Sequence, residues 1–249
     1  MDFVVVIPAR YDSTRFPGKP LADIAGEPMV ARVAERAAKS GARDVLVATD
    51  HKAIAETVRA CGYTAVMTRR SHASGTDRIA EVARRLRYPA HRIVVNVQGD
   101  EPLIEPALIR AVASRLARER GAHIATACTP LRDAREFHDP NIVKAVLDNA
   151  GRALYFSRAP IPHVRDAAGS MRGVPAYRHL GLYAYRCGFL KQFTKLKPAA
   201  IERAEALEQL RALAHGFRIV ATITRKSPYP GVDTPADLER VRSYFEQRA

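Results

Sequence analysis

The sequence predicts an α/β protein built on a doubly wound, mostly parallel sheet, because short apolar strands alternate with amphipathic helices in its first half. The first apolar run, residues 3–7, opens directly into a loop punctuated by Gly and Pro. A second run, residues 93–97, ends in Gln98, Gly99 and Asp100. Open sheets of this class bind ligands at the carboxyl ends of their strands. We therefore expect the functional residues at that edge.

The elements of the first half follow in alternation. Residues 28–40 are expected to form a helix, since Pro28 suits its first position and Gly41 its C-terminal stop. A Ser-Gly-Thr turn at 74–76 begins another helix, which runs to residue 86. The remaining pattern predicts strands at 44–49, 64–67, 93–97 and 124–127, and helices at 53–61 and 106–120. This rhythm is typical of a parallel, right-handed arrangement.

The pattern changes after Pro130. Apolar runs at 142–147 and 153–156 flank an Asp-Asn-Ala-Gly turn, which predicts a β-hairpin. An alternating strand is expected at 178–185, helices at 188–195 and 201–215, and a further strand at 218–223. Thr234 and Asp237 form a capping box that starts the last helix. We expect a single domain over residues 1–249, with an accessory element around 150–190.

The composition is that of an ordinary globular protein, with 47% hydrophobic and 27% charged residues. Neither a signal peptide nor an apolar stretch long enough to cross a membrane is visible. We therefore expect a cytoplasmic protein without membrane insertion. The three cysteines, Cys61, Cys128 and Cys187, lie far apart in the sequence, which argues against a zinc site or a disulfide framework.

The formal net charge of +14 has two interpretations. Nucleic-acid-binding proteins concentrate such charge in stripes and carry recognisable modules. Here the cations are scattered, as in Arg32, Arg36 and Lys39, and the sequence contains no such module. A solvated basic surface that also attracts anionic metabolites is therefore favoured, and a nucleic-acid-binding protein is the remote alternative.

The loop at residues 8–20 is predicted to be a phosphate clamp. It carries Arg10, Arg15 and Lys19, and its only acidic residue is Asp12. Cations crowded on one short loop repel one another unless an anion sits among them, and a triphosphate fits best. The fingerprints GxGxxG and GxxxxGK(S/T) are absent, so neither a dinucleotide fold nor a P-loop is supported.

Two aspartates are candidates for a magnesium site. Asp100 follows the strand at 93–97, and Asp233 precedes the last helix. Carboxylate oxygens are ligands that Mg²⁺ prefers, and two carboxylates with nucleotide phosphates would complete an octahedral site. Otherwise Asp100 merely caps a turn and Asp233 complements a helix dipole. The two carboxylates can meet if the strand at 218–223 joins the sheet.

Several polar residues of the second half can be interpreted either as ligand-binding residues or as ordinary structural residues. His179 lies on a strand face that also bears tyrosines, and it is either a sugar ligand or a core histidine. Taken alone, the core interpretation is favoured. Glu205, Glu208 and Gln209 share one face of the helix expected at 201–215, where a solvated polar stripe is the simplest interpretation.

Taken together, these segments closely resemble the 3-deoxy-D-manno-octulosonate (Kdo) cytidylyltransferases, the CMP-Kdo synthetase family of Gram-negative bacteria. The matching stretches are VVIPARYDSTRFPGKPL, VATDH, SGTDR, VNVQGDEP, ALYFSR, YRHLGLYAYR, LEQLR and GVDTPADLERVR. FSR, RHLG and LEQLR are specific to this family rather than to nucleotidyltransferases at large. The resemblance implies a sheet of the nucleotide-diphospho-sugar transferase type, with the accessory element serving sugar binding and dimerisation.

The resemblance also implies roles at the matching positions. The catalytic residues would be Lys19, Arg15, Asp100 and Asp233, with Mg²⁺ carried by the two aspartates. The nucleotide would be bound by Arg10, Arg15, Lys19, Ser74, Gly75, Thr76, Arg78 and Gln98. The sugar would be bound by Gln98, Arg158, His179, Tyr185, Glu208 and Gln209.

The reaction implied by the resemblance is CTP + Kdo → CMP-Kdo + diphosphate, a step of lipopolysaccharide biosynthesis. The anomeric hydroxyl of Kdo would attack the α-phosphorus in line. A homodimer formed partly through the region after residue 150 is expected. The nearest alternative substrate is another acidic ketose, such as a sialic-acid-like sugar or an amino analogue of Kdo. The SGTDR segment departs from the family pattern, with Asp77 where Glu is usual.

Overall fold

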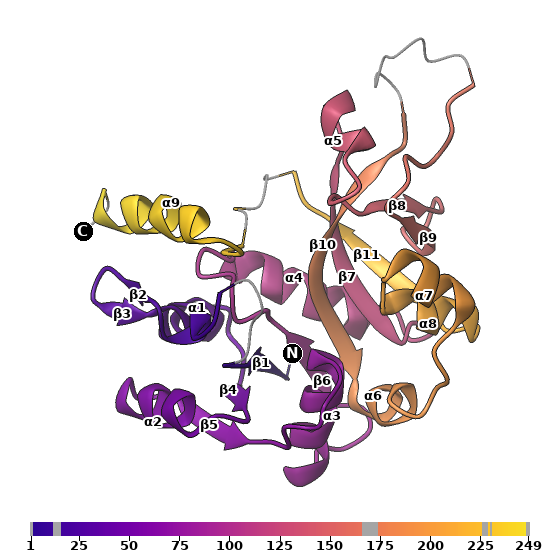
Figure 1. The fold of residues 1–249 in the computed structure, drawn as a ribbon. Coiled ribbons are helices and arrows are strands. Elements are labelled where there is room, and N and C mark those ends of the chain that lie inside the picture. Colours follow the sequence, from indigo (N-terminus) through magenta and orange to yellow (C-terminus); the bar gives the residue numbers. More distant parts are fainter. Residues whose placement is uncertain (1, 12–15, 166–173, 226–228, 230, 248–249) are drawn as a thin grey trace.

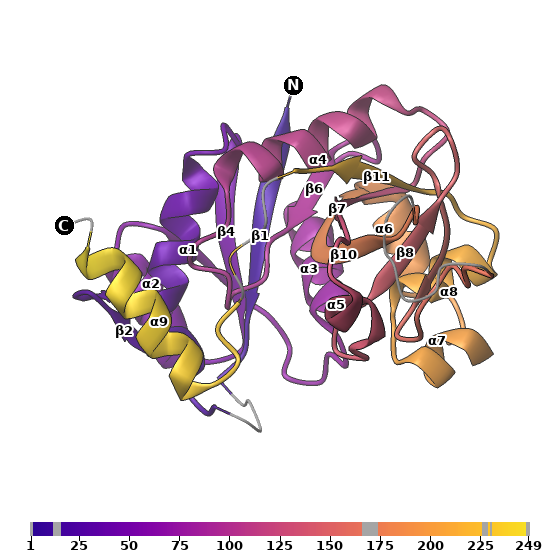
Figure 2. The same ribbon diagram turned by 90° about the horizontal axis from the view of Figure 1, so that it is seen from above.

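The computed structural model describes residues 2–11, 16–165, 174–225, 229 and 231–247. Within them, a nine-stranded sheet has the order β11-β7-β10-β6-β1-β4-β5, with β8 and β9 attached beside β10 (Figure 1). Helices cover both faces of this sheet (Figure 2). The predicted doubly wound α/β class is confirmed. In the same described residues, no helix combines the length and apolar character needed to span a bilayer.

The first half of the chain supplies most of the parallel strands. Its elements are β1 (Phe3–Ala9), the 3₁₀ turn η1 (Lys19–Leu21), β2 (Asp23–Ile24), β3 (Glu27–Pro28), α1 (Met29–Ala38), β4 (Asp44–Thr49), α2 (Lys52–Ala60), β5 (Thr64–Met67), α3 (Gly75–Arg85), β6 (Ile93–Asn96), α4 (Pro106–Arg118) and β7 (Ile124–Pro130). β1 is central, and its neighbours β4 and β6 are both parallel to it. β5 extends the sheet beyond β4.

The second half begins with the predicted hairpin. Its elements are α5 (Ala134–His138), β8 (Lys144–Leu147), β9 (Ala153–Ser157), β10 (Tyr177–Arg186), α6 (Cys187–Phe193), α7 (Ala200–Glu205), α8 (Gln209–Ala214), β11 (Ile219–Ile223) and α9 (Pro235–Glu246). The antiparallel pair β8–β9 confirms the hairpin. Its turn is held by the Asp148 carboxylate, which accepts hydrogen bonds from the backbone N–H groups of Ala150 and Arg152.

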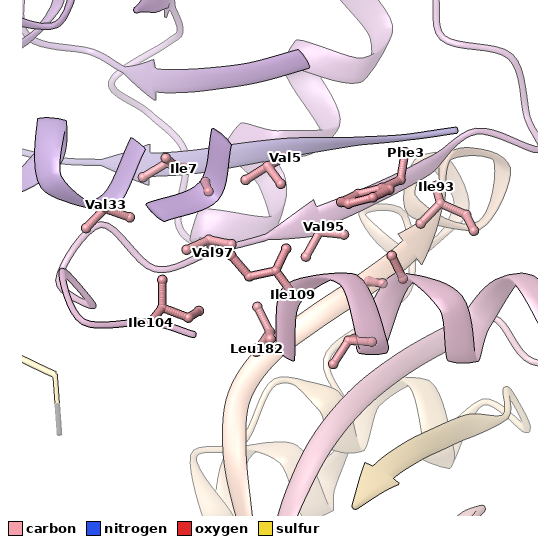
Figure 3. Packing of buried hydrophobic residues seen from close by; sticks show 14 of the residues in the cluster. Phe3, Val5, Ile7, Val33, Ile93, Val95, Val97, Ile104, Ile109 and Leu182 are labelled. Carbon is pink, nitrogen blue, oxygen red and sulfur yellow. The ribbon is translucent and has the colours of Figure 1, made fainter. Parts of the chain in front are cut away.

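Side chains of β1 fill both layers of the core. Phe3, Val5 and Ile7 are buried on the face covered by α1 and α4, together with Ile109 of α4 (Figure 3). Val4 and Val6 are buried on the opposite face, with residues of α3, α6 and α8. A strand buried on both faces needs apolar residues at every position, which explains the unbroken apolar run in the sequence.

β10 differs from the expectation for a parallel sheet. It lies between β6 and β7 and is antiparallel to both. Its side chains alternate, so that Leu182 and Ala184 join the α4 layer while Tyr183 and Tyr185 join the layer of α3 and α8. The strand therefore brings aromatic residues of the second half against a helix of the first half.

The chain after β11 returns to the turn that follows β6. β11 pairs in parallel with β7, so the late strand joins the sheet, as the metal hypothesis required. Beyond it, the backbone N–H of Val232 donates to the carbonyl of Asp100 at 2.8 Å. Thr234 and Asp237 form the predicted capping box of α9. Buried apolar side chains then hold α9 beside β2, although these elements are far apart in sequence (Figure 1).

The single helix expected at residues 201–215 is wrong, because the structure has two short helices there. Ala206 adopts a left-handed conformation, with φ 51° and ψ 46°, and ends α7. The Glu205 side chain instead accepts a hydrogen bond from Ser157 Oγ at 2.6 Å, and Glu208 accepts one from Thr76 Oγ1 at 2.6 Å. These two carboxylates are therefore not a solvated stripe, and tertiary hydrogen bonds override helix propensity.

The left-handed break leads to a stability prediction. Ala206→Gly should stabilise the protein by about 0.5–1 kcal/mol, because glycine lacks the Cβ atom that strains this conformation. Ala204→Gly is the matched control, since Ala204 is an exposed helical residue of α7 and its replacement should destabilise by up to ~1 kcal/mol. Urea unfolding measures both. Equal destabilisation by the two substitutions would contradict the left-handed placement of Ala206.

Candidate functional site

A lysine and two aspartates from three distant segments meet at the carboxyl edge of the sheet. The Lys19 ammonium lies 2.7 Å from Asp100 Oδ2 and 3.6 Å from Asp233 Oδ1. It also donates to the carbonyl of Val232 at 2.8 Å. The Lys19 side chain is 13% exposed and that of Asp233 is 55% exposed, so the cluster opens to solvent beside Asp233. The condition for the two aspartates to meet is fulfilled, because the strand at 218–223 joins the sheet and both carboxylates lie at the Lys19 ammonium.

Two glycines allow the backbone to pass this closely. A Cβ atom on Gly99 would lie 2.9 Å from the carbonyl oxygen of Pro8 in β1, closer than a side chain can approach. A Cβ atom on Gly231 would lie 3.2 Å from the carbonyl oxygen of Asp100. The glycines of the QGD and GVD segments therefore set how near the two carboxylate-bearing turns can come.

The basic loop after β1 is anchored at both ends. Arg10 is half-buried at the end of β1, whereas Arg15 lies outside the described residues. The backbone N–H of Gly18 donates to the carbonyl of Tyr11 at 3.0 Å, and Gly18 has a positive φ of 71°. The Tyr11 ring stacks on His51, with 4.1 Å between ring centroids. The loop is thereby tied to the turn that follows β4.

This stack of Tyr11 on His51 is a part of the site that the sequence analysis missed. Tyr11 follows β1 and His51 follows β4, and the two strands are parallel neighbours. Parallel neighbours deliver the residues after them to the same edge of a sheet. The sequence analysis applied this rule to VNVQGDEP only. The same rule applied to VATDH would have placed His51 at the site.

The N-terminus of α3 lies against the end of β1. Ser74 Oγ accepts a hydrogen bond from the backbone N–H of Asp77 at 3.1 Å, and the Asp77 carboxylate accepts one from the backbone of Ser74 at 3.3 Å. Asp77, which stands where Glu is usual in the family, therefore completes a capping box with Ser74. Gly75 packs against Pro8, and Thr76 is buried. Backbone N–H groups in the first turn of a helix favour anionic ligands.

Arg78, which the resemblance assigns to the nucleotide pocket, has its side chain inside the protein, and its role in nucleotide binding stays a prediction. Its side chain is fully buried, with Nη2 2.7 Å from Asp50 Oδ2 and Nη1 donating to Thr68 Oγ1. A buried guanidinium requires such partners, because an unpaired charge away from water is strongly destabilising. Arg78 therefore holds the turns after β4 and β5 in place instead of facing an open surface.

Several predicted sugar residues lie where β10 meets α3 and α8. Glu208 accepts from Thr76 Oγ1, and its carboxylate together with burial raises the pKa of Tyr185, with burial the larger cause. Gln209 is 6% exposed, and its Nε2 has no hydrogen-bond partner among the described residues. An unpaired buried amide is an available donor for a ligand hydroxyl.

His179 lines the same side of β10. Its Nε2 lies 2.9 Å from Thr126 Oγ1, and its ring contacts those of Phe156 and Tyr183 at centroid distances of 4.8 and 5.3 Å. Burial lowers the pKa of His179 to about 3. The residue is therefore neutral at physiological pH, and it suits hydrogen bonding to hydroxyl groups better than binding to a carboxylate.

Arg158 and Gln98 follow two different strands of the sheet. Gln98 is half-buried and follows β6, next to Asp100. Arg158 follows β9, where its Nε donates to the carbonyl of Glu205 at 2.9 Å and its Nη1 to that of Pro140 at 3.0 Å. β9 also carries Phe156, which contacts the His179 ring. The chain after β9 is thus brought to the His179 side of the sheet.

A cavity of about 460 Å³ adjoins the aspartate cluster. Its wall includes Glu101 and Gly231 on the cluster side and His179 on β10, while most of the remaining lining is apolar and comes from α4, β10 and β11. Burial, with a smaller effect of the Asp100 carboxylate, raises the pKa of Glu101 to about 7. The cavity therefore extends from the neighbours of the aspartate turns to β10.

Comparison with known proteins shows the family to which the chain belongs. The sequence profile of the cytidylyltransferase family matches residues 4–219. The chain belongs to this family. Among solved structures, it is similar to CMP:2-keto-3-deoxy-manno-octonic acid synthetase in complex with CTP, with 41% sequence identity, a TM-score of 0.93 and full coverage of both chains.

A cytidylyltransferase from Leptospira borgpetersenii serovar Hardjo-bovis (strain JB197) is a more distant likeness. Its sequence is 16% identical, the TM-score is 0.64, and the match covers 99% of this chain and 87% of that chain. At this identity the likeness shows the fold alone. The confirmed fold is thus the nucleotide-diphospho-sugar transferase type.

In a cytidylyltransferase, the basic loop and the α3 N-terminus offer donors to phosphate groups, and the aspartates offer oxygen atoms to a cation. No group of three or more His, Cys, Asp or Glu side chains suited to a metal occurs in the part of the chain that the structure describes. A metal ion held by Asp100 and Asp233 would therefore take its other ligands from the substrates and water.

His179 should remain neutral until strongly acidic pH. An NMR titration of its ring should show no transition between about pH 5 and 8, because burial keeps the folded-state pKa near 3. The unfolded chain protonates this ring near pH 6.5, so folding stability should fall as the pH decreases below that value. His179→Gln should weaken this acid dependence. A midpoint near pH 6.5 in the folded protein would contradict the buried placement.

Proposed function

We propose that this cytidylyltransferase activates Kdo by the reaction CTP + Kdo → CMP-Kdo + diphosphate. The observation that carries the proposal is the likeness to CMP:2-keto-3-deoxy-manno-octonic acid synthetase, at 41% identity over the whole of both chains. That sugar is Kdo, and the solved synthetase is bound to CTP. The product is the activated sugar of lipopolysaccharide biosynthesis.

Asp100 and Asp233 fit a magnesium ion as the cofactor. Both carboxylates already face one cation, the Lys19 ammonium, and both side chains remain partly exposed. Hard oxygen atoms of this kind, completed by phosphate oxygens and water, match the ligands that Mg²⁺ prefers. When bound, the ion would neutralise charge at the α-phosphate and lower the pKa of the attacking hydroxyl, so no nearby His or Asp is required as base.

The protein groups contribute mainly position and charge. Arg10, Arg15 and Lys19 bind the phosphates of CTP, and the first turn of α3 at 74–76 donates backbone N–H groups to the nucleotide. Lys19 and Arg15 stabilise the negative charge that grows on the departing diphosphate. The anomeric hydroxyl of Kdo, held on the opposite side of the α-phosphorus, then attacks in line.

The sugar is held by groups with distinct chemistry. Arg158 suits the Kdo carboxylate, because a guanidinium binds a carboxylate through two parallel hydrogen bonds. The neutral His179, the Glu208 carboxylate and the Nε2 of Gln209, which has no hydrogen-bond partner among the described residues, suit hydroxyl groups. Tyr185 of β10 and Gln98 complete the sugar-binding set, and Gln98 lies between the nucleotide and the sugar.

We place the enzyme in the cytoplasm as a homodimer. The exposed apolar side chains in the region after residue 150 support this assembly, since Leu154 of β9 is 61% exposed and Ile201 of α7 is 36% exposed. Apolar surface of this kind suits contact with a second subunit. The accessory element around 150–190 would then serve both the sugar pocket and the dimer.

The direct test is diphosphate release from CTP with Mg²⁺, measured with Kdo, with a sialic acid and without sugar. Release should depend on Kdo. Release with the sialic acid instead would move the assignment to another acidic ketose, and no release with either sugar from folded protein would overturn the enzymatic proposal.

The same assay tests the role of Asp233. Asp233→Asn should lower Kdo-dependent turnover by at least ~100-fold, the loss expected for a principal electrostatic group. Asp237→Asn is the matched control, because Asp237 caps α9 and binds the backbone N–H of Asp233, whereas the Asp233 carboxylate faces Lys19. It should lose stability and keep turnover within a few-fold. Near-wild-type turnover of Asp233→Asn would contradict the metal assignment.

A further inference from the structure

Lys144 is a fully buried lysine held by backbone carbonyls. It is 0% exposed and begins β8. Its ammonium donates to the carbonyls of Asp139 at 2.8 Å and Ile142 at 2.7 Å, and also to that of Arg158. These bonds use the three N–H donors of an ammonium group. Burying such a charge is costly, so its placement on the Arg158 carbonyl calls for a reason.

Glu205 binds the same stretch of backbone from the other side. Its Oε2 accepts from the backbone N–H of Arg158 at 2.9 Å, and its Oε1 accepts from Ser157 Oγ at 2.6 Å. The left-handed residue Ala206 ends α7 directly after Glu205. The backbone of Arg158 is thus held at its N–H by a carboxylate and at its carbonyl by an ammonium.

The side chain of Arg158 is aligned by the same segments. Its Nε donates to the carbonyl of Glu205 at 2.9 Å, and Nη1 donates to that of Pro140 at 3.0 Å. Pro140 follows Asp139, whose carbonyl binds Lys144. A guanidinium has five N–H donors, and within the described residues these carbonyls engage Nε and Nη1. The second N–H of Nη1 and the N–H groups of Nη2 are left, and one from each nitrogen can form a two-pronged contact with a carboxylate.

We propose that Lys144 and Glu205 are positioning residues for the carboxylate of the acidic sugar substrate. By fixing both polar groups of the Arg158 backbone, they set the direction of its guanidinium before the sugar binds. A pre-aligned arginine loses less side-chain entropy on binding, which strengthens the contact. The inference rests on the proposed function, because it requires a substrate that carries a carboxylate.

Lys144→Met tests the proposal, since methionine keeps an unbranched apolar stem and removes the ammonium. The KM for Kdo should rise about tenfold or more, while the KM for CTP stays unchanged and kcat changes less. Glu205→Gln should give the same selective rise. If Lys144→Met does not fold, the KM values of Glu205→Gln test the proposal.

Arg186→Met is the matched control for loss of a cation bound to carbonyls. Arg186, at the far end of β10, donates to the carbonyls of Leu116, Glu119 and Ala122. Its replacement should lower the melting temperature without a selective rise in the KM for Kdo. If Lys144→Met and Glu205→Gln also change stability alone, or raise both KM values equally, the proposed role is overturned.

Chemical rescue separates positioning from general stability. Lys144→Ala leaves carbonyls that converge on the place of the ammonium, so added methylammonium should lower the raised KM for Kdo towards the wild-type value. An equal effect of methylammonium on Arg186→Ala, or none on Lys144→Ala, would overturn the inference. Wild-type protein that releases no diphosphate with Kdo would instead overturn the proposed function.

Discussion

The approach of Lys19, Asp100 and Asp233 is the interaction on which the rest of the site depends. Two carboxylates repel each other at short range unless a cation lies between them, and the Lys19 ammonium takes that position, 2.7 and 3.6 Å from their oxygens. The backbone bond from Val232 to Asp100 holds the two turns together. Gly99 leaves the space that the turn carrying Asp100 needs to pass close to β1. Charge, hydrogen bonding and close backbone packing thus converge on one point.

The antiparallel strand β10 joins the two halves of the site. Because it inserts between β6 and β7, residues that follow β6 and residues of β10 share one sheet edge (Figure 1). The bond from Thr76 of α3 to Glu208 connects the proposed nucleotide side with the proposed sugar side. The break at Ala206 lets Glu205 and Glu208 bind different partners. A continuous helix would keep both side chains on one face.

The alternation of β1 and its neighbours could be predicted from the sequence, because apolar runs and Gly or Pro punctuation act locally. The position of β10 and the end of α7 could not, since they depend on contacts with distant residues such as Ser157 and Thr76. The approach of Asp100 and Asp233 followed once β11 was placed in the sheet. The burial of Arg78 did not follow, because nothing in the sequence pairs it with Asp50, 28 residues earlier. The Arg15 assignment lies outside the described residues.

The most direct measurement is thermal unfolding of Lys19→Met in a Mg²⁺ titration without nucleotide. Removing the ammonium leaves the Asp100 and Asp233 carboxylates facing each other, so Mg²⁺ should raise the melting temperature of Lys19→Met more than that of the wild type. Adding Asp233→Asn to Lys19→Met should abolish the gain. A gain no larger than that of the wild type, or one that persists with Asp233→Asn, would contradict a shared cation site at these aspartates.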